Sequence, residues 1–246
     1  MIDIFRSEWT KIRSVRSTVW TLAVTAVLMV GLGALVSAAA KGSTDEAIPA
    51  GQAAVLSLSG VMFAQLGMAT LGVLVISSEY RTGGIRTSLM AVPQRMRLLT
   101  GKLVVFVGTA LVVSVLASAA ALVVGLAITR PASIEVGQVM EPLAGAGLYL
   151  TACGVFGLGL GTMIRHTPGA LVSAIALMLV LPQVMNQIPG KWAQTAAEYF
   201  TTNAGMLVVL PGRDGSLGPW SGFGVYLAWI AVAVIAGAVL MQRRDA

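Results

Sequence analysis

Long runs of apolar residues alternate with short polar segments along the whole chain. Six of these runs contain no Asp, Glu, Lys, Arg or His. Each is at least about twenty residues long, the length at which a helix crosses the ~30 Å hydrocarbon core of a bilayer. Segments of ~10 alternating residues, which mark a membrane β-barrel, are absent from the pattern. The sequence therefore predicts an all-α membrane protein, one transmembrane domain over residues 1–246, with spans at about 19–40, 54–78, 103–129, 143–164, 169–188 and 222–241.

Composition agrees with this class. Hydrophobic residues make up 57% of the chain and charged residues 11%, and the mean hydropathy is +0.86. In a soluble domain about a quarter of the residues are charged. A charge at the middle of a bilayer costs about 2.5 to 3.5 kcal/mol on insertion scales, which fits six spans without charges.

The basic residues are distributed unevenly between the two sides of the predicted bundle. Cytoplasmic loops of membrane proteins carry an excess of Lys and Arg. If the N-terminus is cytoplasmic, twelve of the sixteen basic residues lie inside and four lie outside. We therefore expect both termini in the cytoplasm. The net charge of +6 then reflects topology, and no nucleic-acid partner is expected.

The segment before the first span, residues 1–18, has the pattern of an interfacial helix. Ile2, Phe5, Trp9 and Ile12 recur at helical spacing with Arg and Lys between them. Such a helix lies on the inner leaflet, with its basic face toward anionic membrane lipid or a cytosolic partner. The first span resembles a signal peptide, but its apolar run exceeds the usual length of about 7 to 15 residues, so we expect it to be retained.

Small residues are dense in the fourth span, where Gly157, Gly159 and Gly161 alternate with leucine. This spacing lets helix backbones approach closely. It fits packing within one subunit and also an interface between subunits.

The fifth span is interrupted near its outer end. Pro182 breaks the hydrogen-bond ladder of the helix, and Gln183, Asn186 and Gln187 follow. Either these amides line a translocation path, or they make interhelical hydrogen bonds near the outer interface. The outer loop at residues 189–221 is too long for a plain turn, and its aromatic residues favour short helices that re-enter or lie on the outer leaflet.

Motifs for nucleotide or metal chemistry are missing from the sequence. A phosphate loop requires a glycine five residues before its Gly-Lys pair, and neither Gly101 nor Gly190 has one. A single cysteine, Cys153, and a single histidine, His166, provide no metal-ligand set. We expect no catalytic residue, no metal site and no cofactor on this chain, so any nucleotide that drives it binds to another subunit.

The inner loop at residues 79–102 carries five basic residues against one acid. It resembles the pattern of type-2 ATP-binding-cassette (ABC) exporter permeases, in which an acid, a glycine turn, a short helix, a proline and a terminal Gly-Lys join the second and third spans. The small actinobacterial-type subunits of this family, whose N-termini also read like SEWTKIRSVRST, are similar. The matching positions are Glu79, Arg81, Gly83, Ile85, Leu89, Pro93, Arg95, Leu98, Leu99, Gly101 and Lys102.

The resemblance implies a membrane subunit that is not itself an enzyme, in the bacterial cytoplasmic membrane. Two permease subunits, as a homodimer or heterodimer, would pair with two cytosolic ABC ATPase subunits that bind ATP and Mg. The complex would export an amphipathic or hydrophobic substrate of the drug, lipid, peptide or glycan class. The inner loop would be the coupling helix, and the implied ATPase-interface residues are Glu79, Arg81, Arg86, Leu89, Met90, Arg95 and Arg97.

Two other interpretations stay open at this point. The inner loop can be a basic segment that is only solvated near anionic lipid. The chain can also be an ATP-independent membrane protein, either a secondary carrier or an immunity or scaffold factor. An ion-coupled carrier is expected to hold an ionisable residue near the middle of the membrane, and the six spans contain none.

Overall fold

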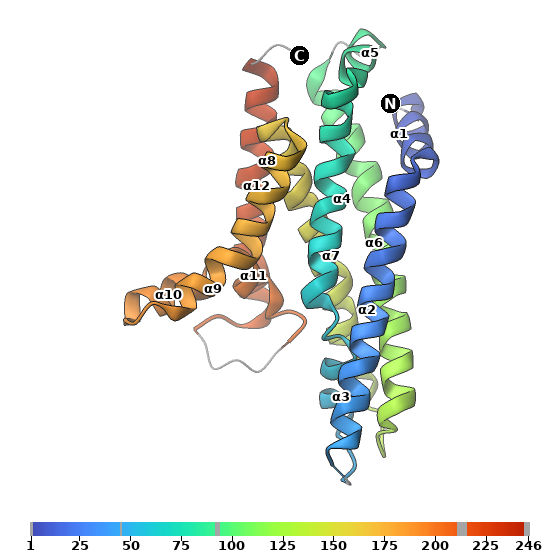
Figure 1. Cartoon of the computed structure of the whole chain (residues 1–246), viewed down its shortest axis with the longest axis vertical. Coiled ribbons are helices and arrows are strands. Elements are labelled where there is room, and N and C mark those ends of the chain that lie inside the picture. Colours follow the sequence, from blue (N-terminus) through green and yellow to red (C-terminus); the bar gives the residue numbers. More distant parts are fainter. Residues whose placement is uncertain (1, 45, 92–93, 211–215, 244–246) are drawn as a thin grey trace.

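The computed structural model describes residues 2–44, 46–91, 94–210 and 216–243, and its regular elements there are all helical. The predicted all-α class is confirmed. Figure 1 shows the helices packed in an elongated bundle, with α4 and α7 in its middle. The elements are α1 (Ile2–Ser14), α2 (Arg16–Gly42), α3 (Ala50–Ser57), α4 (Val61–Thr82), α5 (Gly84–Ala91), α6 (Arg95–Thr129), α7 (Val136–Ile164), α8 (Thr167–Ile175), the π-helical turn η1 (Ala176–Val180), α9 (Leu181–Gln187), α10 (Lys191–Glu198), α11 (Thr201–Met206) and α12 (Pro219–Arg243).

Six helices in the described part of the chain are long and apolar enough to cross a membrane, as predicted. They are α2, α4, α6, α7, the continuous run α8–η1–α9, and α12. The amphipathic leader forms α1, which contacts α6 and α2. Near the inner loop, α6 begins at Arg95 rather than at Leu103, so the end of that loop is part of the third long helix.

The second long helix begins at Val61 rather than at Ala54. Residues 54–57 belong to the separate helix α3, and the chain turns before α4. The break brings the backbone against α2: a Cβ at Gly60 would lie 2.3 Å from the carbonyl oxygen of Met29, and one at Gly33 would lie 2.0 Å from that of Ser57. The break thus falls at Leu58, Ser59 and Gly60, where the chain approaches α2 closely, within a run that the sequence predicted as one span.

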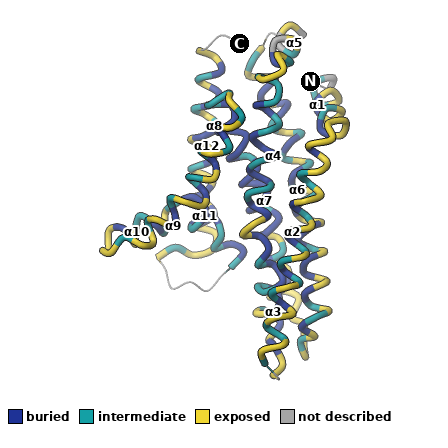
Figure 2. Tube along the Cα trace, viewed as in Figure 1, coloured by how far each residue is buried: buried dark blue, intermediate teal, exposed yellow. Residues whose placement is uncertain are grey.

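The core is built around α7. In the most apolar stretch of α7, 78% of the residues are buried, whereas in the corresponding stretches of α2 and α12 only 22% are. Figure 2 shows the buried residues concentrated along α7. The alternating glycines of α7 make its close contacts: a Cβ at Gly157 would lie 2.1 Å from the Ala69 carbonyl oxygen in α4, and one at Gly159 would lie 3.0 Å from the Ala233 backbone in α12. These glycines pack helices within one subunit.

Candidate functional site

Helix α5 lies at the same end of the bundle as α1 and the end of α12 (Figure 1). Gly83 ends α4 with φ +72°, a left-handed conformation that favours glycine and turns the chain into α5. Ile85 at the start of α5 is 2% exposed and packs in the core, whereas Met90 near its other end is 77% exposed. The helix is therefore anchored at one end and presents an apolar side chain to the outside at the other.

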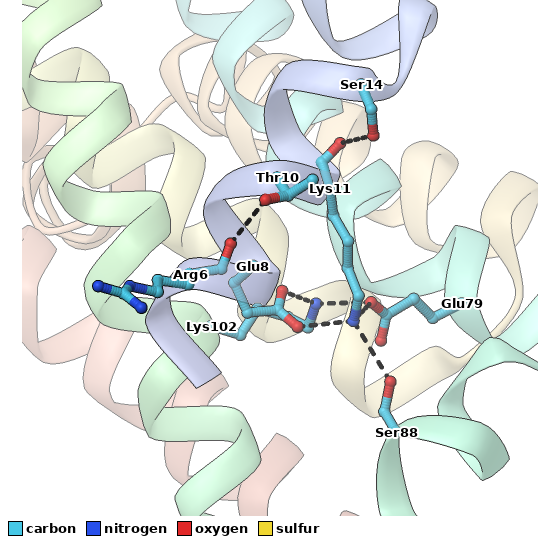
Figure 3. Close-up of polar contacts among 8 residues, drawn as sticks. All are labelled: Arg6, Glu8, Thr10, Lys11, Ser14, Glu79, Ser88 and Lys102. Atoms are coloured by element: carbon cyan, nitrogen blue, oxygen red, sulfur yellow. Dashed lines mark hydrogen bonds and ion pairs between the residues drawn. The ribbon is translucent and has the colours of Figure 1, made fainter. Parts of the chain in front are cut away.

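A cluster of four charged residues lies beside α5 and joins α1 to α4 and α6. We call Glu8, Lys11, Glu79 and Lys102 the ion cluster (Figure 3). Lys11 Nζ lies 2.7 Å from Glu8 Oε1 and 2.9 Å from Glu79 Oε1. Lys102 Nζ lies 2.8 Å from Glu79 Oε1 and also pairs with Glu8 Oε2. Two acids and two lysines thus neutralise one another.

The ion cluster also reaches α5 directly. Lys11 Nζ donates a hydrogen bond to Ser88 Oγ at 3.3 Å. Burial opposes the charge of Lys11, but its hydrogen bonds with Glu8 and Glu79 outweigh burial and raise its pKa above the ordinary value. The ammonium group therefore stays charged at neutral pH, and the link between α1 and α5 is intact there.

The Gly101-Lys102 pair of the sequence has a structural explanation. A Cβ at Gly101 would lie 2.5 Å from Cγ2 of Ile4, so glycine allows α1 to lie directly on α6. Lys102, only 2% exposed, then reaches Glu8 across this contact. Buried charges are stable only when they are paired and hydrogen-bonded, so the position of α1 and the identity of residue 102 depend on each other.

Two arginines hold the end of α12 at the same side of the bundle. Arg95 Nη1 donates to the Met241 carbonyl oxygen at 2.7 Å, and Arg165 Nη2 donates to that of Leu240 at 3.2 Å. The guanidinium of Arg165 also lies 5.0 Å from the ring centre of Tyr80. Cations at the C-terminal end of a helix compensate its free carbonyl groups and its dipole.

The structure separates the predicted ATPase contacts into two sets. Arg81, Met90 and Arg97 are exposed and accessible to another protein. Glu79 is in the ion cluster and Arg95 binds the end of α12, so both have contacts inside this chain. The side chains of Arg86 and Leu89, and the whole of Pro93, lie outside the described residues. The role of Glu8 was not found from the sequence, although its spacing of three residues from Lys11 is that of an ion pair on one helix.

The three amides predicted for a path, Gln183, Asn186 and Gln187, are exposed on α9. Helix α9 contacts η1, α10 and α11, and it extends with α10 sideways from the bundle (Figure 1). The amides therefore do not face the interior of a single chain. The sequence left two roles open for these amides, lining a translocation path or making interhelical hydrogen bonds. In either role, the groups that they contact lie outside the described residues of this chain.

The break at Pro182 is closed by the outer loop itself. Proline has no N–H for the carbonyl of Met178, four residues earlier. Thr202 Oγ1 donates to that oxygen at 2.7 Å, and Thr201 Oγ1 donates to the Leu177 oxygen at 2.7 Å. Helix α11 thus enters the bundle and supplies the hydrogen bonds that the π-helical turn and the proline leave open. These threonines were not singled out for this role from the sequence.

Replacing Thr202 by valine is expected to lower the free energy of unfolding by about 1 to 3 kcal/mol, because a buried carbonyl loses its hydrogen bond. The measurement is the unfolding midpoint of the purified protein in detergent. Thr195→Val is the matched control, since Thr195 is exposed on α10 and donates within its own helix to Lys191. Equal midpoints for the two variants would contradict the role given to Thr202.

These features define a multi-pass α-helical membrane protein with a short helix exposed at one end of its bundle. Residues 4–185 match the model of a family described as ABC-2 family transporter protein, and the chain belongs to this family. The resemblance seen in the inner loop is thus confirmed. The match covers most of α1, all of the elements from α2 to η1, and part of α9. No curated protein matches the chain.

Membership makes the chain a membrane permease subunit and implies association with an ABC ATPase. The geometry fits that assignment at one place in particular. Helix α5 is attached to the bundle through Ile85 and Ser88 and exposes Met90, and the ion cluster connects it to α1, α4 and α6.

Proposed function

We propose that the chain is the permease of an ATP-driven exporter and that α5 is the helix on which its cytosolic ATPase docks. The observation that carries the proposal is that contacts within the chain hold α5 in place. A basic loop that is only solvated near lipid needs no internal support, whereas α5 is anchored by Ile85 and by the bond from Lys11 to Ser88. Its exposed Met90 has the character of an interface anchor, with Arg81 and Arg97 as nearby candidates for charge contacts.

In this proposal, α1, α5 and both termini face the cytoplasm of a bacterial cell, as the uneven distribution of basic residues predicts. Two permease subunits pair with two ATPase subunits, which bind ATP and Mg. Closure of the ATPases on ATP moves α5, and the motion passes through the ion cluster into the long helices α4 and α6. A small rigid displacement at α5 then opens a central path outward.

The cargo is proposed to be amphipathic or hydrophobic. The six long apolar helices contain few charges, and a strongly charged cargo would need compensating charges along its path. The exposed amides Gln183, Asn186 and Gln187 supply hydrogen-bonding groups for the polar part of such a cargo where two permease subunits meet.

The test is capture of the ATPase from native membranes. Tagged permease expressed in its own host is purified in mild detergent, and the proteins retained with it are identified by mass spectrometry. We expect an ABC ATPase with a phosphate-loop sequence in stoichiometric amount and ATP hydrolysis by the purified complex. Repeated purification of the permease without any ATPase, or with one whose hydrolysis drives no transport after reconstitution, would reject the proposal.

A further inference from the structure

A cavity of about 510 Å³ lies between α1, α2, α4 and α5, next to the ion cluster. This volume is in the range of about 300 to 1,000 Å³ that is usual for small-molecule sites. One part of its wall is apolar and is formed by Ile12, Val15, Leu74 and Val75. The cavity thus offers an apolar surface directly beside charged groups, which suits an amphiphile.

The charged part of the wall has an excess of positive charge. Lys11, Lys102 and Arg81 line the cavity together with Glu8 and Glu79. The ion cluster is internally neutral, so the excess comes from Arg81, which is exposed. A guanidinium binds phosphate oxygens with paired, charge-assisted hydrogen bonds. The wall therefore favours a ligand with a negative phosphate group.

Glu79, which lines the cavity, has a carboxylate oxygen without a hydrogen-bond partner among the described residues. Both lysine contacts of Glu79 are made by its Oε1 atom. Its Oε2 atom is buried and accepts no hydrogen bond from the described residues. A buried carboxylate oxygen in this state is costly, and a ligand hydroxyl group would satisfy it.

The place of the cavity in the fold points to a lipid as the source of such a ligand. Helix α1 is amphipathic, and Trp9 in α1 and Trp20 near the start of α2 are 52% and 70% exposed. Exposed tryptophans gather at the headgroup level of a bilayer. Because α1 and the start of α2 also line the cavity, it lies at the depth of lipid headgroups on the side of the membrane that α1 occupies.

We propose that this cavity is a binding site for an anionic glycerophospholipid with a hydroxylated headgroup, of the phosphatidylglycerol type. The phosphate is bound by Arg81, a headgroup hydroxyl lies beside the Glu79 carboxylate, and the glycerol and upper acyl carbons lie on Ile12, Val15, Leu74 and Val75. The site belongs to the permease alone and holds whether or not an ATPase docks on α5. A lipid bound there touches α1, α4 and α5 together and fixes their relative positions.

The experiment measures lipid binding to the purified permease without an ATPase. The permease is delipidated in detergent, and native mass spectrometry follows the binding of phosphatidylglycerol, phosphatidylcholine, phosphatidylethanolamine and phosphatidic acid, added singly. We expect one phosphatidylglycerol to bind most tightly. Arg81→Gln should weaken it about tenfold or more, the usual effect of losing one charge-assisted hydrogen bond. Arg97→Gln is the matched control, since Arg97 is an exposed arginine at the same end of the bundle that does not line the cavity.

A second variant tests the cavity without changing charge. Ser17→Trp places a bulky side chain at its wall from an exposed position, and it should reduce phosphatidylglycerol binding as Arg81→Gln does. Free glycerol 3-phosphate is added as a competitor; if it binds alone as tightly as the lipid, the ligand is a soluble phosphate and the lipid assignment is wrong. Equal binding of all four lipids, or equal effects of the variants at residues 81 and 97, would overturn the proposal.

Discussion

Replacing Lys102 by methionine is expected to lower the free energy of unfolding of the permease by about 3 to 5 kcal/mol, as removal of one partner from a buried ion pair usually does. Lys102 is 2% exposed and contacts both Glu8 and Glu79. Without it, the cluster holds two carboxylates, of which Glu8 is only 2% exposed, and a single ammonium group. The measurement is the midpoint of unfolding in mixed micelles at neutral pH.

A double variant separates charge balance from packing. Glu8→Met combined with Lys102→Met removes one acid and one base and leaves the pair of Lys11 and Glu79, whose atoms lie 2.9 Å apart. It should recover most of the lost stability, because no buried charge then lacks a partner. Lys191→Met is the control, since Lys191 is exposed on α10. If Lys102→Met and Lys191→Met unfold alike, the ion cluster does not hold α1, α4 and α6 together.

Replacing Met90 by aspartate is expected to abolish transport and to weaken the proposed complex with the ATPase at least about thirtyfold. A new carboxylate at the centre of an apolar contact costs about 2 kcal/mol or more. Because Met90 is 77% exposed, the change should leave the stability of the permease itself nearly unaltered. Affinity is measured by titrating immobilised permease with the ATPase captured with it, and stability by the unfolding midpoint.

Met140→Asp is the matched control for this prediction. Met140 is 51% exposed on α7, near the end of the bundle where α3 contacts α7. The same change of chemistry there should leave ATPase affinity within about twofold of wild type, since a surface substitution away from an interface has little effect on it. If both variants bind the ATPase equally well, α5 is not its docking helix.

The helices followed from the sequence because their apolar runs are long and free of charges. The break before Val61 did not, because Ser59 and Gly60 are also compatible with a continuous helix, and the close contact of Gly60 with Met29 in α2 becomes apparent only in the packed structure. The short helix in the inner loop was implied by the resemblance to the permease family, in which Gly83 is one of the matching positions. The partners of Lys102 lie 94 and 23 residues away, and such pairings depend on how the helices pack rather than on any local pattern.

The contacts of the fifth span also depend on packing rather than on a local sequence pattern. Pro182 and its amides indicated an interruption from the sequence, and the structure contains a π-helical turn there. That Thr201 and Thr202 close the gap depends on the path of a loop more than twenty residues long, as their partners are 24 residues distant. A polar threonine in an apolar segment gives no sign by itself of which carbonyl it will meet.

The two arginines at the end of α12 give the bundle a mechanical connection that the order of the chain does not provide. Arg95 is the first residue of α6, close behind α5, and it holds the carbonyl of Met241, 146 residues away. Arg165, at the end of α7, holds the neighbouring carbonyl of Leu240. A force on α5 that shifted the start of α6 would therefore also act on the last helix, so that α6 and α12 would move together.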